Sequence, residues 1–338
     1  MTAELPYAFG GPPLRGRLRA EPEDFFVDEL IGFAATGAGE HWLLHIEKRG
    51  ANTAWAVKRV AAFAGLGERD IGYAGMKDRH AVTRQFFSVP ARKGATLDWS
   101  VFNEPDVRIL SAVRHARKVH RGALSGNRFV IVVRELAGDR TRADAVLERI
   151  RSGGVPNYFG EQRFGLGGGN VDKARAMFEG RRFERAERSI LLSAARSELF
   201  NAVVAQRVEA GSWDRPLAGD VFQLDGRSAI FGPEPIDEVL AARVAQGEVH
   251  PTGPLWGEGE LRSTEGVAAL ERGVAETHAD LAKGVAAAGM AQERRALRIH
   301  AKGLEWAWLE EHSLRIEFAL PPGAYATSTL RELVDFNS

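Results

Sequence analysis

The sequence predicts an α+β protein of two domains or one large one, and three observations support that class. In the N-terminal third, segments typical of strands alternate with segments typical of helices. After Gly154 the pattern changes to longer helices joined by glycine- and proline-rich turns. A last alternating segment, 313–320, then returns to the pattern of a strand. Such grouping of strands and helices is typical of α+β architectures.

The first clear strand and helix follow one another at 41–64. Residues 41–48 (HWLLHIEK) are mostly apolar with a polar end, as in a largely buried strand. The next segment has a helical period of apolar residues. Asn52 or Thr53 can cap its N-terminus, and Gly65 ends it. Residues 127–136 (NRFVIVVREL) are rich in Val and Ile and predict a second strong strand.

Four further helical patterns follow that strand. Thr141 and Asp144 form a capping pair for a helix that Gly153 and Gly154 end. A long helix is predicted over 189–211, with apolar residues at a spacing of four. Two alanine-rich helices are expected before residue 301.

The C-terminal segment predicts a half-buried strand and a short helix. Leu314, Ile316 and Phe318 alternate with more polar neighbours, and two prolines end the run. Thr329 and Glu332 have the spacing of a capping box for the last helix.

Composition excludes several classes of protein. The 338 residues include 44% hydrophobic residues, enough for a sizeable core. They contain no cysteine, so disulfides, thiolate metal sites and cysteine nucleophiles are impossible. No apolar run is long enough to span a bilayer, and no secretory leader is recognisable. A soluble, cytoplasmic protein is therefore expected.

Positive charge is local, although Lys plus Arg and Asp plus Glu each number 45. Three basic segments stand out, 107–127, 181–188 and 294–302. A single such segment is usually a solvated face, but several near one acidic motif favour a phosphate-lined partner such as RNA. Stacking of an unpaired base would need aromatic side chains, and the candidates are Phe25, Phe86, Tyr158, Phe159 and Tyr325.

Metal and nucleotide motifs are weak. His41 and His45 have a zinc-ligand spacing only on a helix, whereas their segment predicts a strand. The glycines of 165–169 (GLGGG) lack the third spaced glycine of a dinucleotide loop, and a tight turn is the better interpretation. No metal and no cofactor are expected.

The carboxylates give two candidate regions. The acids of 21–29 (EPEDFFVDE) alternate with apolar residues, which predicts an exposed strand face. Asp78 differs because Lys77, Arg79, His80 and Arg84 surround it in the sequence. An acid that a cation keeps ionised and a pocket keeps dry can act as a nucleophile or base. A solvated turn is the alternative, and local spacing does not decide between them.

Longer motifs then point to a family. The segment GMKDRHAVTRQ, which contains Asp78, closely resembles the central motif of the TruD family of tRNA pseudouridine synthases. Six further segments resemble family motifs in the same order. They are RLRAEPEDFFVDE, GEHWLLHIEKRGANT, RGALSGNRFVIVVRE, GVPNYFGEQRFGLGGGN, LSAARSELFN and PPGAYATSTLREL. The resemblance covers nearly the whole chain.

The resemblance implies an activity and its residues. The enzyme would isomerise a uridine of tRNA, expected at position 13, to pseudouridine without cofactor or metal. Asp78 matches the catalytic aspartate, Phe25 an aromatic contact to the target nucleotide, and Asn127 a polar contact. Tyr325 falls where the family pattern has Phe. Arg19 matches a basic residue able to pair with the aspartate, and Arg331 and Lys77 are weaker candidates for that pairing.

The resemblance also implies a domain organisation. A pseudouridine synthase catalytic domain with a mixed, largely antiparallel sheet would comprise 1–153 and 304–338. A large α/β insertion characteristic of the family would comprise 154–303. The partner would be tRNA, the protein a monomer, and no membrane would be involved.

Two other functions and two mechanisms remain open at this point. A glycoside hydrolase would use two of Glu23, Asp24, Asp28 and Asp78. A non-catalytic RNA-binding protein would not need Asp78 at all. Within the synthase hypothesis, Asp78 could attack C1′ of the nucleotide or abstract the C2′ proton.

Overall fold

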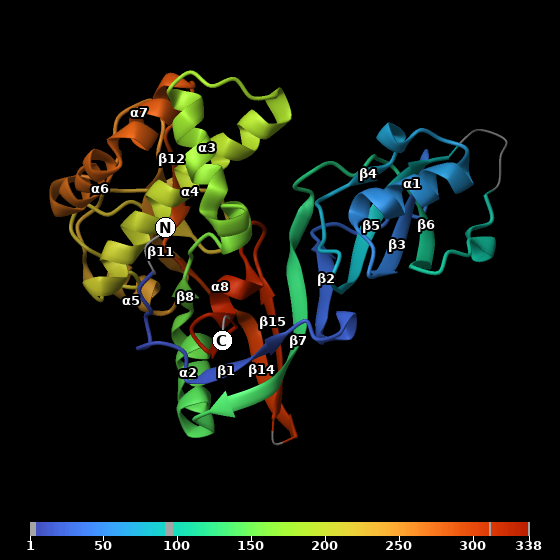
Figure 1. The fold of residues 1–338 in the computed structure, drawn as a ribbon, viewed down its shortest axis with the longest axis horizontal. Helices are drawn as coiled ribbons and strands as arrows, with labels where there is room; N and C mark the ends of the chain where they lie inside the picture. The colour runs from blue at the N-terminus through green and yellow to red at the C-terminus, as the bar shows by residue number, and fades with distance from the viewer. Residues whose placement is uncertain (1–4, 92–96, 311, 337–338) are drawn as a thin grey trace. The chain divides into compact units, whose positions relative to one another are not determined.

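The chain forms two compact units, each assembled from separate stretches of sequence (Figure 1). The structure is a computed structural model that describes residues 5–91, 97–310 and 312–336. Unit 1 consists of Met1–Pro13, Asp139–Ala301 and Ala324–Val334. Unit 2 consists of Leu14–Gly138, Lys302–Gly323 and Asp335–Ser338.

Unit 2 is built on a mixed β-sheet. Seven strands follow one another in the order β14-β15-β7-β2-β5-β3-β6, and β1 and β4 pair with β7 and β5 beside this path. β2 runs parallel to β5, whereas the other neighbouring pairs along the path are antiparallel. The predicted α+β class with a mixed, largely antiparallel sheet is therefore confirmed. The strands are β1 (Leu14–Leu18), β2 (Phe25–Ile31), β3 (His41–Arg49), β4 (Gly72–Tyr73), β5 (Val82–Pro90), β6 (Val107–His115), β7 (Leu124–Gly138), β14 (Lys302–Glu310), β15 (Ser313–Leu320) and β16 (Val334–Asp335).

Helix α1 (Thr53–Ala64) covers β3 and β5 (Figure 1). It begins and ends as predicted. The Asn52 Oδ1 accepts a hydrogen bond from the Trp55 N–H at 2.7 Å, and Gly65 ends the helix at φ +63°. Its apolar face packs with alternate β3 residues, including Leu44 and Ile46, in one buried cluster. Short 3₁₀ turns occur at η1 (Pro22–Asp24), η2 (Glu68–Asp70) and η3 (Trp99–Val101).

Unit 1 is organised around the long helix α4 (Arg185–Glu209). The predicted apolar spacing is correct, since Leu191, Ala195, Leu199 and Val203 are all buried in a core shared with α3, α6 and α7. A four-stranded sheet, β10-β9-β11-β12, and the pair β13-β8 belong to the same unit. The other elements are α2 (Arg140–Gly153), α3 (Gly169–Phe178), α5 (Glu238–Ala245), α6 (Glu265–Thr277), α7 (Ala279–Ala287), α8 (Ala326–Leu330), η4 (Glu161–Arg163), η5 (Leu166–Gly168), β8 (Val155–Pro156), β9 (Phe222–Leu224), β10 (Ile230–Phe231), β11 (Val249–Leu255), β12 (Glu293–Ala296) and β13 (Arg298–Ile299).

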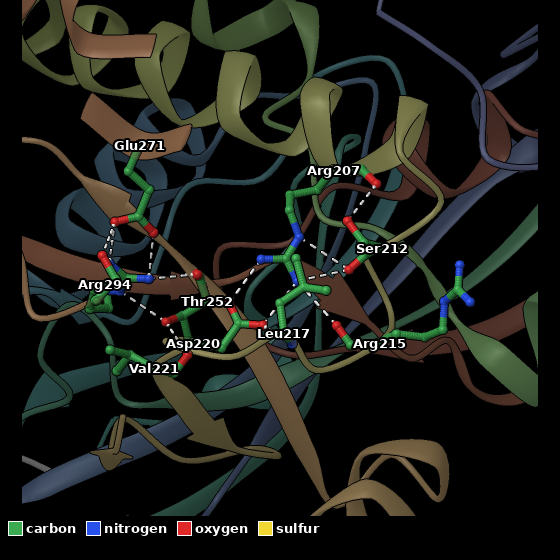
Figure 2. Close-up of polar contacts among 10 residues, drawn as sticks. Arg207, Ser212, Arg215, Leu217, Asp220, Val221, Thr252, Glu271 and Arg294 are labelled. Carbon is green, nitrogen blue, oxygen red and sulfur yellow. Dashed lines mark hydrogen bonds and ion pairs between the residues drawn. The ribbon is translucent and has the colours of Figure 1, made fainter. Parts of the chain in front are cut away.

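Two buried ion pairs stabilise unit 1 (Figure 2). Arg207 at the end of α4 contacts Asp220 through both terminal nitrogens, at 2.8 and 3.0 Å, and both side chains are buried. The same guanidinium donates to the Ser212 carbonyl oxygen. Arg294 pairs in a similar way with Glu271. Multiple hydrogen bonds of this kind compensate for removing the charges from water.

Two predicted helix caps are wrong. Helix α2 begins after Asp139, whose side chain accepts from the Arg142 N–H at 3.0 Å, so Thr141 lies inside the helix. The capping box at Thr329 and Glu332 does not form either. The buried Glu332 carboxylate instead accepts the backbone N–H groups of Ala8 and Phe9, from more than 300 residues away. Two backbone N–H groups from a distant part of the chain therefore occupy the carboxylate that was expected to cap the local helix.

The two compact units differ in extent from the predicted catalytic domain and insertion. Helix α2 and the chain segment before Leu14 belong to unit 1. Arg142 of α2 donates to the carbonyl oxygens of Gly10 and Gly11, which ties that segment to the helix. The division at 153/154 and 303/304 stays a prediction about family organisation, and its ends at 1–4 and 337–338 lie outside the described residues. None of the described helices has the length and apolar character needed to cross a membrane.

Candidate active site

Asp78 lies in an irregular segment that joins β4 to β5, which we call the motif loop (residues 74–81). The loop follows Tyr73 of β4 and ends before Val82 of β5, and the two flanking strands pair antiparallel. Paired strands fix both ends of the loop. The Asp78 side chain is therefore presented by a short segment anchored on a rigid sheet.

Arg19 forms an ion pair with Asp78. Its Nη2 donates to the Asp78 Oδ2 at 2.7 Å. The same guanidinium lies 4.2 Å from the ring centroid of Phe25, a distance typical of a cation–π contact. Lys77 and Arg331, the other residues considered for this pairing, have different partners. Arg19 thus connects the predicted catalytic acid to the predicted aromatic residue.

Asp78 is partly exposed to solvent. Its side chain is 42% exposed, and the following residues Arg79 and His80 are exposed as well. This partial exposure lies between the dry pocket and the solvated turn that the sequence left open. Arg19 contacts one carboxylate oxygen, Oδ2, and the side chain keeps access to solvent.

Lys77 points in the opposite direction, into the unit. Its Nζ lies 2.9 Å from the Glu29 Oε2 and donates to the Asn127 Oδ1 at 2.6 Å. Glu29 is fully buried and also accepts the Phe86 N–H. Since an ammonium can only donate, it requires the Asn127 carbonyl oxygen and leaves the amide N–H₂ facing elsewhere.

Strand alternation explains why these residues meet. Phe25, Val27 and Glu29 of β2 pair with Ile131, Phe129 and Asn127 of β7, so the six side chains share one face of the sheet. The phenyl rings of Phe25 and Phe129 are 6.2 Å apart in an edge-to-face arrangement. The site is thus built at the polar end of an otherwise apolar sheet face.

Lys48 supports the motif loop through hydrogen bonds to main-chain oxygens. Its Nζ donates to the carbonyl oxygens of Ala51 at 2.6 Å and Asp78 at 2.7 Å. Burial lowers the pKa of Lys48 to about 8, although the nearby Asp78 carboxylate opposes the shift. The Lys77 N–H donates to the Thr53 hydroxyl, which supports the loop at a second point.

Phe25 does not present an open ring. It is 3% exposed, packs against Phe129 and is covered by the Arg19 guanidinium. Among the other aromatic candidates, Tyr158 and Phe159 are buried, whereas Phe86 and Tyr325 are partly exposed. Three of the five candidate rings are therefore buried, and Phe86 and Tyr325 are the two candidates with exposed surface for stacking.

Tyr325 belongs to unit 1, where it precedes α8. Its hydroxyl accepts a hydrogen bond from the Arg163 Nη2 at 2.9 Å, and its ring meets Phe159 edge to face. The hydroxyl that departs from the family pattern therefore has a protein partner. Arg331, in the same unit, donates to the carbonyl oxygens of Leu5 and Pro6.

Two of the acids expected on an exposed strand face are buried. Asp24 accepts two hydrogen bonds from Arg134 and one from the Glu21 N–H, and Glu29 pairs with Lys77. That expectation is wrong because each acid has a cationic partner that the sequence places far away. Asp28 remains partly exposed, 3.6 Å from the His45 Nε2. No group of three or more metal-ligating side chains occurs within the described ranges.

The basic segments differ in their exposure. In 107–127, Arg108, Arg117 and Arg121 are exposed, and Arg108 also pairs with Glu47. In 294–302, Arg294 and Arg298 are internal, and burial lowers the pKa of Arg298. This third segment is therefore not a basic surface, because the guanidinium groups of Arg294 and Arg298 make their contacts inside unit 1.

Comparison with known proteins decides the family. The family model described as tRNA pseudouridine synthase D (TruD) matches residues 4–172 and 181–333. The chain belongs to the TruD family. The tRNA pseudouridine synthase D of Xanthomonas campestris pv. campestris (strain B100) is 51% identical over 346 residues, covering 98% of this chain and 94% of the relative. That of Methylococcus capsulatus is 46% identical over 336 residues, with 99% and 95% covered.

A solved structure supports the fold of this TruD-family chain. The crystal structure described as a tRNA pseudouridine synthase D from Methanosarcina mazei superposes with a TM-score of 0.73 at 20% identity. It covers 97% of this chain and 95% of the other. At that identity the likeness concerns the fold alone.

Sequence reasoning missed two buried residues of this TruD-family site. The pattern of 21–29 predicts an exposed Glu29, and that of 41–48 predicts Lys48 as the polar end of a strand, whereas both residues are buried. A signal for Lys48 was available. It lies two positions after Ile46 and four after Leu44, so strand alternation places it on the same covered face.

Proposed function

We propose that this chain, as a TruD-family tRNA pseudouridine synthase, isomerises uridine 13 of tRNA with Asp78 as its catalytic residue. The observation that carries the assignment is the 2.7 Å ion pair between Arg19 and Asp78 within the family's central motif. The pair places a guanidinium directly beside the carboxylate, the kind of group that serves as a nucleophile or a general base.

The reaction rearranges one nucleotide without changing its composition. The N1–C1′ glycosidic bond breaks, the uracil turns, C5 bonds to C1′, and the proton of C5 is replaced by one on N1. Asp78 either attacks C1′ and is later displaced, or removes the C2′ proton and returns it. The target base must first leave its stack, at a cost of a few kcal/mol.

Bound RNA would complete the environment of the acid. One side of Asp78 is already covered by Arg19, and a nucleotide on its exposed side would exclude water from the carboxylate. Two exposed arginines of segment 107–127, Arg117 and Arg121, are available to phosphates. The Asp78 carboxylate would then be shielded from water only in the complex with RNA.

Asn127 would read the uracil. Because Lys77 occupies its carbonyl oxygen, its amide N–H₂ is the group left to donate. A uracil carbonyl oxygen accepts such a bond, so we assign Asn127 a donor role toward the target base. Phe25 supports the Arg19 guanidinium that pairs with Asp78. Tyr325 is assigned a contact with the substrate, as the family resemblance implies.

The finer organisation is part of the same proposal. The catalytic domain would comprise 1–153 and 304–338, with 154–303 as an insertion. The protein would act as a monomer in the cytoplasm, without metal or cofactor.

The test compares wild type, Asp78→Asn and the control Asp106→Asn, an exposed aspartate of unit 2. Pseudouridine in tRNA is mapped chemically after incubation, and tRNA binding is measured separately. We expect modification at position 13 by wild type and control, and binding without modification by Asp78→Asn. Residual turnover by that variant, or release of free uracil, would overturn the proposal.

A further inference from the structure

Lys48 places an ammonium group inside unit 2. Its side chain continues the covered face of β3 after Leu44 and Ile46, and the residue is 0% exposed. Lysine is rarely fully buried, because removing its charge from water is costly unless partners compensate.

The partners of this ammonium are main-chain carbonyl oxygens. It donates to Ala51 O at 2.6 Å, to Asp78 O at 2.7 Å and, more weakly, to Lys77 O at 3.5 Å. No carboxylate among the described residues is within ion-pair distance of it. Replacement of Lys48 by an apolar residue would therefore spare unit 2 a desolvated charge, which suggests that the lysine serves something other than stability.

The contact fixes the residue that carries the acid. With its carbonyl oxygen held by Lys48 and its carboxylate held by Arg19, Asp78 is restrained at both ends. The loop before it is held separately, since Thr53 accepts the Lys77 N–H and Gln85 donates to Gly75 O. Among the side-chain hydrogen bonds of the described residues, only that of Lys48 reaches the main chain of Asp78 itself.

We propose that Lys48 is a positioning residue for catalysis, whose ammonium fixes the main chain of Asp78 and adds positive potential near its carboxylate. The inference rests on the proposed role of Asp78. A misplacement of about 1 Å at a reacting group can slow a reaction about 10²-fold, so a loop contact of this kind has a measurable effect on rate.

The charge of Lys48 depends on pH. Burial lowers its pKa to about 8, Asp78 raises it and Lys77 lowers it. The neighbouring side chains on α1 and β5, Thr53, Thr83 and Gln85, carry no charge, and Glu29 of β2 is engaged by Lys77. Above this pKa the neutral amine has one N–H fewer and no charge, so the restraint on Asp78 weakens and turnover falls.

The sign for stability is opposite. The folded-state pKa lies below the ordinary value of 10.5, so the unfolded chain binds more protons between about pH 8 and pH 10.5. Stability from this group therefore rises with pH across that window. An enzyme that becomes more stable and less active in the same range is not explained by loss of folding.

The experiment measures single-turnover rates on folded tRNA from about pH 6 to about pH 10. It uses wild type, Lys48→Met, the control Lys58→Met on the exposed face of α1, and Asp78→Asn. Melting temperatures and tRNA affinities are recorded over the same range. Wild type and control should lose activity with a midpoint near 8. Lys48→Met should be slower by about 10²-fold at neutral pH, with unchanged tRNA affinity and no such midpoint.

Several results would overturn the inference. They are a rate in Lys48→Met equal to wild type, the same alkaline midpoint in both, or a wild-type rate that does not fall. If Lys48→Met did not fold, the wild-type profile would still decide. A midpoint near 8, together with a melting temperature that does not fall across it, supports the inference, and its absence contradicts it. Loss of activity in Asp78→Asn tests the proposed function independently of either result.

Discussion

Arg19 illustrates how much a single residue contributes to this site. Its φ of +60° lies in the left-handed region, which residues other than glycine seldom adopt. That conformation costs roughly 1 kcal/mol or more and persists where the surroundings require it. Here the Arg19 guanidinium contacts both Asp78 and the Phe25 ring. The strained backbone therefore belongs to the residue that pairs with the acid.

Arg19→Gly separates the side chain from the backbone. Glycine accepts positive φ without strain, so folding should be little affected. A charge-assisted hydrogen bond contributes about 1.5–3 kcal/mol, and turnover should fall about 10- to 100-fold. The nearby Arg17→Gly removes only an exposed pair with Glu135 and serves as the control. Equal single-turnover rates for the two variants would remove Arg19 from the site.

At the scale of elements, the loop and β2 are joined by a buried ion pair. Lys77 of the motif loop reaches Glu29 of β2, and both side chains are almost completely buried. Breaking a buried pair costs about 3–5 kcal/mol because it leaves a charge without a counterion. The pair therefore fixes the loop to the sheet and sets the orientation of Asn127.

A double-mutant cycle tests that coupling. Glu29→Gln and Lys77→Met should each lower the free energy of unfolding by up to about 3–5 kcal/mol. The double variant should lose less than the sum, since neither charge is then left alone. Glu135→Gln, which affects an exposed pair, should change stability by about 1 kcal/mol or less. Additive losses in urea unfolding would show that the two residues are independent.

The sequence predicts elements well where the signal is local. Asn52 and Gly65 bound α1 as expected, and Leu314, Ile316 and Phe318 alternate into the core. It fails where a polar group has a distant partner. Glu332 accepts from Ala8 and Phe9 rather than capping its own helix, and no local pattern records such a partner.

The candidate site divides in the same way. The motif containing Asp78 is recognisable by resemblance, and Arg19 was named as a partner for it. The sequence does not indicate the roles of Lys48 and Glu29, because these depend on which side chains the loop brings to the covered sheet face. It also leaves the exposure of Asp78 open, since charged neighbours in sequence do not determine solvent access in space.

At the scale of the whole molecule, each unit has its own core and its own internal charges. Unit 1 contains the Arg207–Asp220 pair, in which the guanidinium also ties down the Ser212 carbonyl after α4 (Figure 2). The motif loop and its contacts lie entirely in unit 2. A substitution that destabilises one unit should therefore have effects that can be measured without a change in the geometry of the other unit.

Asp220→Ala is expected to destabilise unit 1. It leaves the buried Arg207 without its carboxylate, so about 3–5 kcal/mol of stability should be lost. The matched control is Glu248→Ala, which removes an exposed partner of Arg243. Hydrogen exchange should show faster exchange in α4 for Asp220→Ala while amides of β3 and β5 keep their protection. Unchanged exchange in α4 would contradict the assignment.

The pairing of β2 with β7 has a consequence for chain length. Phe25 and Glu29 lie four positions apart, an even interval, and their side chains are therefore on the same side of the sheet. Deleting or inserting a single codon between them would rotate one of the two outward and replace it with Phe26, Asp28 or a newcomer. The number of residues between Phe25 and Glu29 therefore matters for function. Natural or engineered variants of this enzyme should tolerate substitutions in this segment far better than insertions or deletions.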